Sequence, residues 1–177
     1  TMHRGRALWV IGIVILGLLP RSASLASADE QLPRPPLKDF SDKPGCEVIE
    51  VRDGDVLVVR VPDEAHVIRL IGVEIPKRDG RAEEARAFLA RLLAGESVYL
   101  EYEPDRTQHD IAGRTWAYVY RAPDGLFVNL ELVRQGYARV GASGRFNQEP
   151  LLRAYEQMAR KARKGLWAPR PGGEAED

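Results

Sequence analysis

The sequence is poor in the residues that build disulfide-rich and metal-rich proteins. Its 177 residues contain one cysteine, Cys46, and three histidines. A single cysteine excludes an intramolecular disulfide framework and a zinc site built on cysteine, and three histidines leave little for a histidine-rich metal centre. We expect Cys46 to be a small apolar residue at the start of a strand. An intermolecular disulfide through this thiol is the alternative.

The chain also lacks a surplus of charge of either sign. Lys and Arg total 26 and Asp and Glu total 26, so the formal net charge is zero. Hydrophobic residues make up 44% and charged residues 29% of the chain. These shares are close to the average for globular proteins, which argues against wholesale disorder, a collagen-like repeat and a polytopic membrane protein. The length predicts one domain with tails or a tight pair of small domains.

The first 28 residues have the layout of a secretory signal. A basic start at residues 2–6 precedes thirteen uncharged residues at 7–19, and small residues then lead to Ala26-Ser27-Ala28. This order predicts a signal peptide cleaved after Ala28, because thirteen apolar residues are too few to cross about 30 Å of hydrocarbon as a helix. We expect the mature chain to be secreted or periplasmic. An uncleaved N-terminal membrane anchor is the alternative.

Removal of residues 1–28 changes the charge of the chain. This segment holds three arginines and no acid, so the mature protein carries 23 basic and 26 acidic residues and a formal charge of −3. Residues 29–45 contain four prolines and are expected to form an extended linker. Residues 168–177 are expected to form a disordered tail. Residues 46–167 then form one domain, which we expect to be monomeric and without stable membrane insertion.

The domain begins with a pattern typical of strands. Short runs rich in β-branched residues favour strands, and turn residues such as Asp53-Gly54-Asp55 separate the first of them. The expected strands lie at 47–52, 56–61, 66–73, 98–102 and 116–121.

Apolar residues at helical spacing predict three helices between and after these strands. They are expected over 81–93, 130–135 and about 150–163. Asn129 is placed to cap the second helix and Gly136 to end it. Five short strands with three helices predict an α+β fold, namely a five-stranded OB-fold-type β-barrel braced by the helices.

The order of the motifs resembles that of staphylococcal-nuclease-like (thermonuclease) domains. Asp53-Gly54-Asp55 and then RLIGVEIP at 69–76 are similar to the family's pattern D-G-D-T followed by R-L-x-G-I-D-x-P-E. GRTWAYV at 113–119 is similar to the family's Y-G-R-x-L-A-Y. Further matches lie at 128–129, 132–138 and 165–167. The resemblance covers about residues 46–167, and it implies a barrel of the OB type and a calcium-dependent phosphodiesterase ancestry acting on DNA and RNA.

The resemblance implies a metal site and a phosphate clamp. Asp55, Glu74 and the main-chain oxygen of Ile75 correspond by position to the family's ligands for Ca²⁺, a hard cation that takes oxygen ligands and can neutralise phosphate charge. Arg69 and Arg114 correspond to the arginines that clamp the phosphate oxygens, a task that suits planar guanidinium groups. We therefore expect Arg69 and Arg114 to be catalytic residues, with calcium as the cofactor.

These residues also have ordinary structural explanations. Asp53 and Asp55 could be turn formers, Arg69 could form an exposed salt bridge, and Arg114 could be solvated beside its glycine. A basic cluster at 160–164 could contact phosphates, but such a run is more often the solvated face of a helix.

The sequence departs from the family's pattern at the general base. Lys77 stands where the family has a glutamate, and an ammonium group cannot accept a proton unless it first loses its own. Glu74 is one methylene longer than the family's aspartate, and Ala112 replaces a tyrosine that contacts phosphate. Two functions remain: an exported thermonuclease-like hydrolase with a modified site and low turnover, or a non-catalytic OB-fold module that binds nucleic acid or a protein partner.

Overall fold

The computed structural model describes residues 33–35, 38–40, 42–78, 80–104, 109–122, 124–141 and 145–169. The predicted signal peptide and most of the predicted tail lie outside these residues. None of the helices in the described part has the length and apolarity that a membrane crossing needs.

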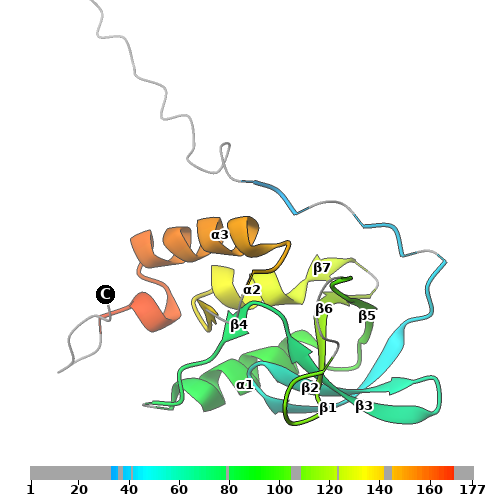
Figure 1. Cartoon of the computed structure of the whole chain (residues 1–177). Helices are drawn as coiled ribbons and strands as arrows, with labels where there is room; N and C mark the ends of the chain where they lie inside the picture. The colour runs from blue at the N-terminus through cyan, green and yellow to red at the C-terminus, as the bar shows by residue number, and fades with distance from the viewer. Residues whose placement is uncertain are drawn as a thin grey trace, which may run out of the picture. The chain divides into compact units, whose positions relative to one another are not determined.

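The centre of the fold is a closed five-stranded barrel (Figure 1). Its strands are β1 (Cys46–Asp53), β2 (Val56–Val61), β3 (Glu64–Leu70), β5 (Ser97–Glu101) and β6 (Thr115–Arg121). Neighbouring strands pair antiparallel in the order β3-β2-β1-β5-β6. A parallel pairing between β3 and β6 closes the barrel. The predicted OB-type barrel of five strands is therefore confirmed.

Three short strands and three helices complete the fold. They are β4 (Val73–Glu74), β7 (Leu126–Phe127), β8 (Arg139–Val140), α1 (Arg81–Leu92), α2 (Val128–Arg134) and α3 (Glu149–Lys161), followed by a 3-10 turn at Gly165–Trp167. α1 packs against β1, and α2 contacts both α3 and β6 (Figure 1). β4 pairs with β8 as a separate two-stranded ladder, and β7 pairs with β6.

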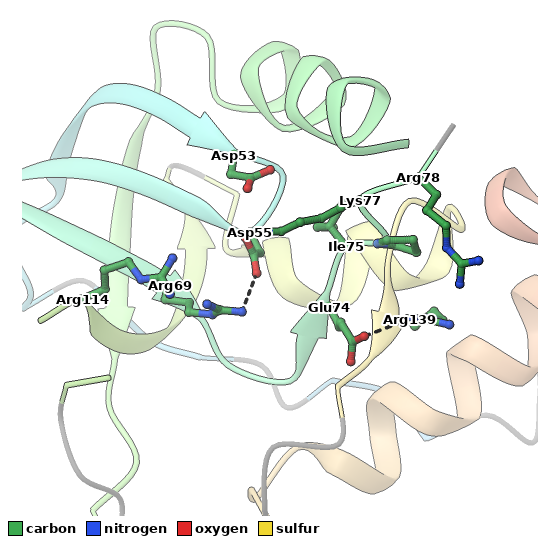
Figure 2. A pocket seen from close by; sticks show the side chains of 10 residues that line it. Asp53, Asp55, Arg69, Glu74, Ile75, Lys77, Arg78, Arg114 and Arg139 are labelled. Atoms are coloured by element: carbon green, nitrogen blue, oxygen red, sulfur yellow. Dashed lines mark hydrogen bonds and ion pairs between the residues drawn. The ribbon is translucent and has the colours of Figure 1, made fainter. Parts of the chain in front are cut away.

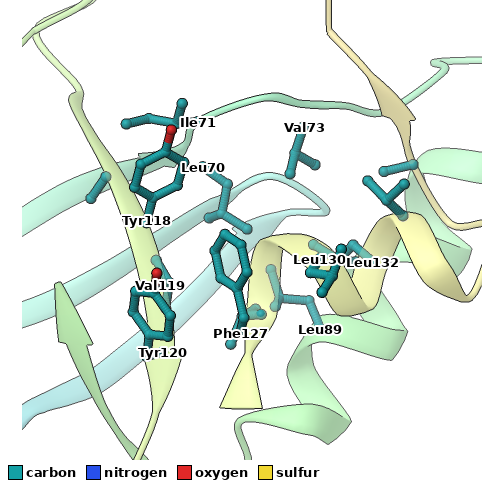
Figure 3. Close-up of a cluster of buried hydrophobic side chains, with 14 of the residues drawn as sticks. Leu70, Ile71, Val73, Leu89, Tyr118, Val119, Tyr120, Phe127, Leu130 and Leu132 are labelled. Carbon is teal, nitrogen blue, oxygen red and sulfur yellow. The ribbon is translucent and has the colours of Figure 1, made fainter. Parts of the chain in front are cut away.

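The core lies where α1 and α2 meet the barrel (Figure 3). Leu70 of β3, Leu89 of α1 and Leu132 of α2 are all fully buried. The rings of Tyr120 and Phe127 stack with centroids 4.8 Å apart beside them. The helices therefore do not merely flank the barrel, because their apolar side chains form one core with those of its strands.

The prediction that Asn129 caps α2 is wrong. The helix begins earlier than expected, with Phe127 at its N-cap, so that Asn129 lies inside it. The fully buried side chain bonds outside its own helix. Its Oδ1 accepts a hydrogen bond from the Val119 amide at 2.9 Å, and its Nδ2 donates one to the Ile71 carbonyl at 2.9 Å. Asparagine near a helix start is typical of a cap, and only the burial of this position shows that the side chain joins α2 to the barrel.

Packing begins before the domain boundary that we predict at Cys46. Phe40 is buried and its ring stacks on Tyr99, with centroids 4.5 Å apart. Nζ of Lys38 lies 2.7 Å from Oε1 of Glu101 on the same strand. Phe40 stands alone among prolines and charged residues, so this segment has no periodic hydrophobic pattern. The sequence therefore predicts a linker here. Cys46 begins β1, and burial raises the pKa of its thiol.

Candidate functional site

A cavity of about 390 Å³ opens beside the turn between β1 and β2 (Figure 2). Five cationic side chains and three carboxylates line it together with two apolar residues. The lining residues are Asp53, Asp55, Arg69, Glu74, Ile75, Pro76, Lys77, Arg78, Arg114 and Arg139. All five site residues expected from the sequence are among them, although they come from segments up to 59 positions apart, from Asp55 to Arg114.

Gly54 brings α1 close to the turn that carries Asp55. A Cβ at Gly54 would lie 2.6 Å from the Cβ of Ala85 in α1 and 3.0 Å from Cγ1 of Ile75. Real Cβ atoms do not approach other atoms this closely, so a larger residue would push the turn away from the helix. The glycine of this motif is thus required for packing, and it holds Asp55 against the loop that contains Ile75.

Asp55 and Arg69 form an ion pair at one wall of the cavity. Arg69 lies opposite Val56 in the ladder of β2 and β3, and its Nη2 lies 3.2 Å from Oδ2 of Asp55. Burial raises the pKa of the Asp55 carboxyl, and the positive charge of Arg69 opposes this shift. The guanidinium carbon lies 5.1 Å from the centroid of the Trp116 ring. Arg69 is therefore fixed by a charge on one side and an aromatic face on the other.

Asp110 holds Arg114 at the same wall. Its Oδ2 lies 2.7 Å from both Nε and Nη2 of Arg114 and 3.9 Å from Nη1 of Arg69. Its Oδ1 accepts hydrogen bonds from the amides of Ala112 and Arg114 at 2.9 Å each. Asp110 is not among the site residues expected from the sequence. An aspartate shortly before Gly113 is nevertheless a recognisable turn signal, because its side chain can bond amides two residues on.

Asp110→Asn is expected to destabilise the domain in a pH-dependent way. Burial raises the pKa of the Asp110 carboxyl, but hydrogen bonds from Arg114 and Ala112 outweigh it and hold the pKa below its ordinary value. A carboxyl with a lowered pKa stabilises the fold above its unfolded pKa, and this stability is lost as pH falls through the folded pKa. We expect the variant to lose about 1–3 kcal/mol of unfolding free energy at pH 7, and less at pH 3.

Urea denaturation at several pH values measures this effect. Asp63→Asn, in the exposed turn between β2 and β3, is the matched control because it makes the same chemical change outside the cavity. A destabilisation by Asp110→Asn that is equal at pH 3 and pH 7 would contradict the role assigned to the carboxylate.

Glu74 is paired across the ladder of β4 and β8. It lies opposite Arg139, and its Oε1 is 3.1 Å from Nη2 of that residue. β8 is held in turn by the buried Glu156 of α3, whose Oε1 accepts a hydrogen bond from the Val140 amide at 3.0 Å. Neither Arg139 nor Glu156 is among the site residues expected from the sequence. No local pattern marks Arg139, because only the pairing of β4 with β8 brings it to Glu74.

Lys77 and Arg78 enter the cavity from the loop between β4 and α1. Both side chains are exposed, and neither forms an ion pair with a carboxylate of the described residues. Figure 2 shows Arg78 and Arg139 on the side of the cavity opposite Arg69 and Arg114. Within the described ranges, no group of three or more His, Cys, Asp or Glu side chains is placed to hold a metal ion.

Comparison with known proteins finds the same kind of domain elsewhere. The family model described as "Staphylococcal nuclease homologue" matches residues 67–169. A thermonuclease of Staphylococcus hyicus is 28% identical over 156 residues, which cover 84% of this chain and 82% of the relative. Protein ParB of Escherichia coli is 32% identical over 130 residues, covering 69% and 71%. A thermonuclease of Staphylococcus intermedius is 34% identical over 99 residues, covering 52% and 56%.

Proposed function

The chain belongs to the staphylococcal nuclease homologue family, and on this premise we propose that it binds the phosphodiester backbone of nucleic acid in the cavity. Arg69 and Arg114 clamp one phosphate. The observation that carries this proposal is that Asp55 and Asp110 hold the two arginines at one wall of a cation-rich cavity. Guanidinium groups bind phosphate oxygens through paired, charge-assisted hydrogen bonds.

The reaction that we propose at this site is slow hydrolysis of a phosphodiester bond. Attack by water builds negative charge on the phosphate oxygens, and guanidinium groups placed in advance stabilise that charge. What the cavity lacks is a base at the position of Lys77, because an ammonium group has no lone pair to take the proton of the attacking water. The domain therefore has the means to bind and polarise the phosphate, and is poor in the means to activate water.

We propose Asp55, Glu74 and the carbonyl of Ile75 as the residues that hold calcium. All three residues line the cavity, and two carboxylates with a peptide oxygen are the donor set that this hard cation prefers. When bound, calcium would neutralise charge on the phosphate. Asp55 and Glu74 are each paired with an arginine, so calcium competes with Arg69 and Arg139 for these carboxylates.

Arg69→Gln and Arg114→Gln test the phosphate clamp. Each variant is expected to weaken binding of single-stranded DNA and RNA by about 10- to 100-fold, because a hydrogen bond to a charged group contributes about 1.5–3 kcal/mol. Fluorescence anisotropy with labelled oligonucleotides measures affinity, and gel assays with calcium or with chelator measure cleavage. The matched controls are Arg60→Gln and Arg91→Gln, which remove arginines that do not line the cavity. Equal losses in the clamp variants and these controls would show that the cavity is not the binding site.

The second candidate function is a nucleic-acid-binding barrel without catalysis. Two observations favour it, namely the lysine at the base position and the ion pair that occupies Glu74. The same assays separate the candidates. Binding without cleavage in the presence of calcium supports the binding module, whereas cleavage that a chelator abolishes supports the nuclease.

A further inference from the structure

We propose that Arg78 and Arg139 form a second phosphate site, which binds the phosphate next to the one between Arg69 and Arg114 and needs no divalent cation. This inference rests on the proposed function, because it assumes that the cavity receives a phosphodiester strand. It adds the direction of that strand across the cavity, from the wall of Arg69 and Arg114 to the wall of the second site.

The size and lining of the cavity support two sites rather than one. A volume of about 390 Å³ lies within the range of about 300–1,000 Å³ that is usual for pockets that enclose a whole small molecule. Cationic groups lie on two opposite sides of it (Figure 2). A single phosphate clamped by Arg69 and Arg114 therefore leaves the opposite wall, with Arg78 and Arg139, uncovered.

The charges of the cavity are unbalanced on that opposite wall. Asp55 is paired with Arg69, and Glu74 is paired with Arg139 through one guanidinium nitrogen. Arg78 has no such carboxylate within the described part of the chain. Like charges that converge in a concave site raise the local potential and attract an anion. A phosphate at this wall would relieve the repulsion between Arg78 and Arg139.

The second site is held together by the fold. Arg78 lies in the loop that follows β4, and Arg139 lies on β8, which pairs with β4. The bond from the Val140 amide to Glu156 fixes β8 on α3. Both cations thus lie on or shortly after the ladder of β4 and β8, which is separate from the turn that holds Arg114.

The described turn before Arg114, residues 110–113, offers no cation for the neighbouring phosphate. Ile111 in this turn is fully exposed, and the following residue is Ala112. Proteins that bind single strands follow the backbone with a positively charged groove. The wall of Arg78 and Arg139 supplies further cations for such a groove.

The test compares two ligands that differ by one phosphate. Thymidine 5′-monophosphate carries one phosphate, and 5′-phosphorylated dithymidylate carries two that are one nucleotide apart. Their affinities for the purified protein are measured by calorimetry in the presence of EDTA. The variant is Arg78→Gln, and the matched control is Arg91→Gln, which removes the same charge outside the cavity. Circular dichroism establishes that both variants are folded.

We expect the unmodified protein to bind the dinucleotide at least about tenfold more tightly than the mononucleotide. Arg78→Gln should lose this preference and keep its affinity for the mononucleotide within about twofold, and the control should keep both affinities. Equal binding of the two ligands by the unmodified protein would overturn the second site and leave the clamp intact. A control that loses as much dinucleotide affinity as the variant would also overturn it. Failure to bind either ligand would overturn the proposed function itself.

Discussion

Lys77→Glu is expected to raise the rate of phosphodiester cleavage by about 10²- to 10⁴-fold at neutral pH, the range that a well-placed general base contributes. The substitution puts a carboxylate into the cavity that Arg69 and Arg114 already line. An ionised carboxylate has the lone pairs that an ammonium lacks, so it can take the proton of the attacking water. Single-turnover cleavage of labelled single-stranded DNA in the presence of calcium measures the effect.

Lys77→Gln is the matched control for this prediction. It removes the positive charge, and with it the repulsion of calcium, but supplies no group that takes a proton. A rate for Lys77→Glu that is no higher than the rate for Lys77→Gln would show that the missing base is not what limits turnover. The rate of the glutamate variant should also rise with pH through the pKa of the new carboxyl and then level off, because only the ionised form acts as a base.

Asn129→Ala is expected to lower the free energy of unfolding by about 2–6 kcal/mol. The side chain is fully buried and satisfies the amide of Val119 and the carbonyl of Ile71. Its removal leaves both groups buried without their partner, and each such loss costs about 1–3 kcal/mol. Ile71 follows β3 and precedes β4, so the variant should also loosen the segment that carries Arg69 and Glu74.

Urea denaturation and the affinity for single-stranded DNA measure the two effects of Asn129→Ala. The control is Asn147→Ala, which truncates an exposed asparagine and should change stability by no more than about 0.5 kcal/mol. Two variants of equal stability would contradict the role of Asn129 as the link between α2 and the barrel.

Much of the fold could be predicted because its signals are local. Five runs of β-branched residues and three amphipathic segments correspond to the five strands of the barrel and the three helices. The errors lie at boundaries and at short elements. The third strand was expected over 66–73 but ends at Leu70, and Gly72 follows with a positive φ of 73°. β4, β7 and β8 are only two residues long, which is too short for a periodic pattern.

The candidate site could be predicted where a motif carries its residues. Asp55, Arg69 and Arg114 each belong to a short segment whose letters match the family pattern, and the structure brings them to one cavity. Asp110 was missed although its signal is local. No local sequence pattern marks Arg139 as a site residue, because it meets Glu74 only through strand pairing across 65 positions.

The sequence by itself determined the order of strands and helices and the family, and it predicted the residues of the proposed clamp, because hydrophobic period and motif spacing are properties of neighbouring positions. The tertiary structure alone decided which charges face one another. It placed Arg139 on Glu74, left Arg78 on the side of the cavity opposite Arg69 and Arg114, and turned Asn129 from its own helix toward the barrel. The physical reason is that ion pairs and buried hydrogen bonds form between groups that the closure of the barrel brings together, and their energies depend on distance and burial that no local stretch of sequence specifies.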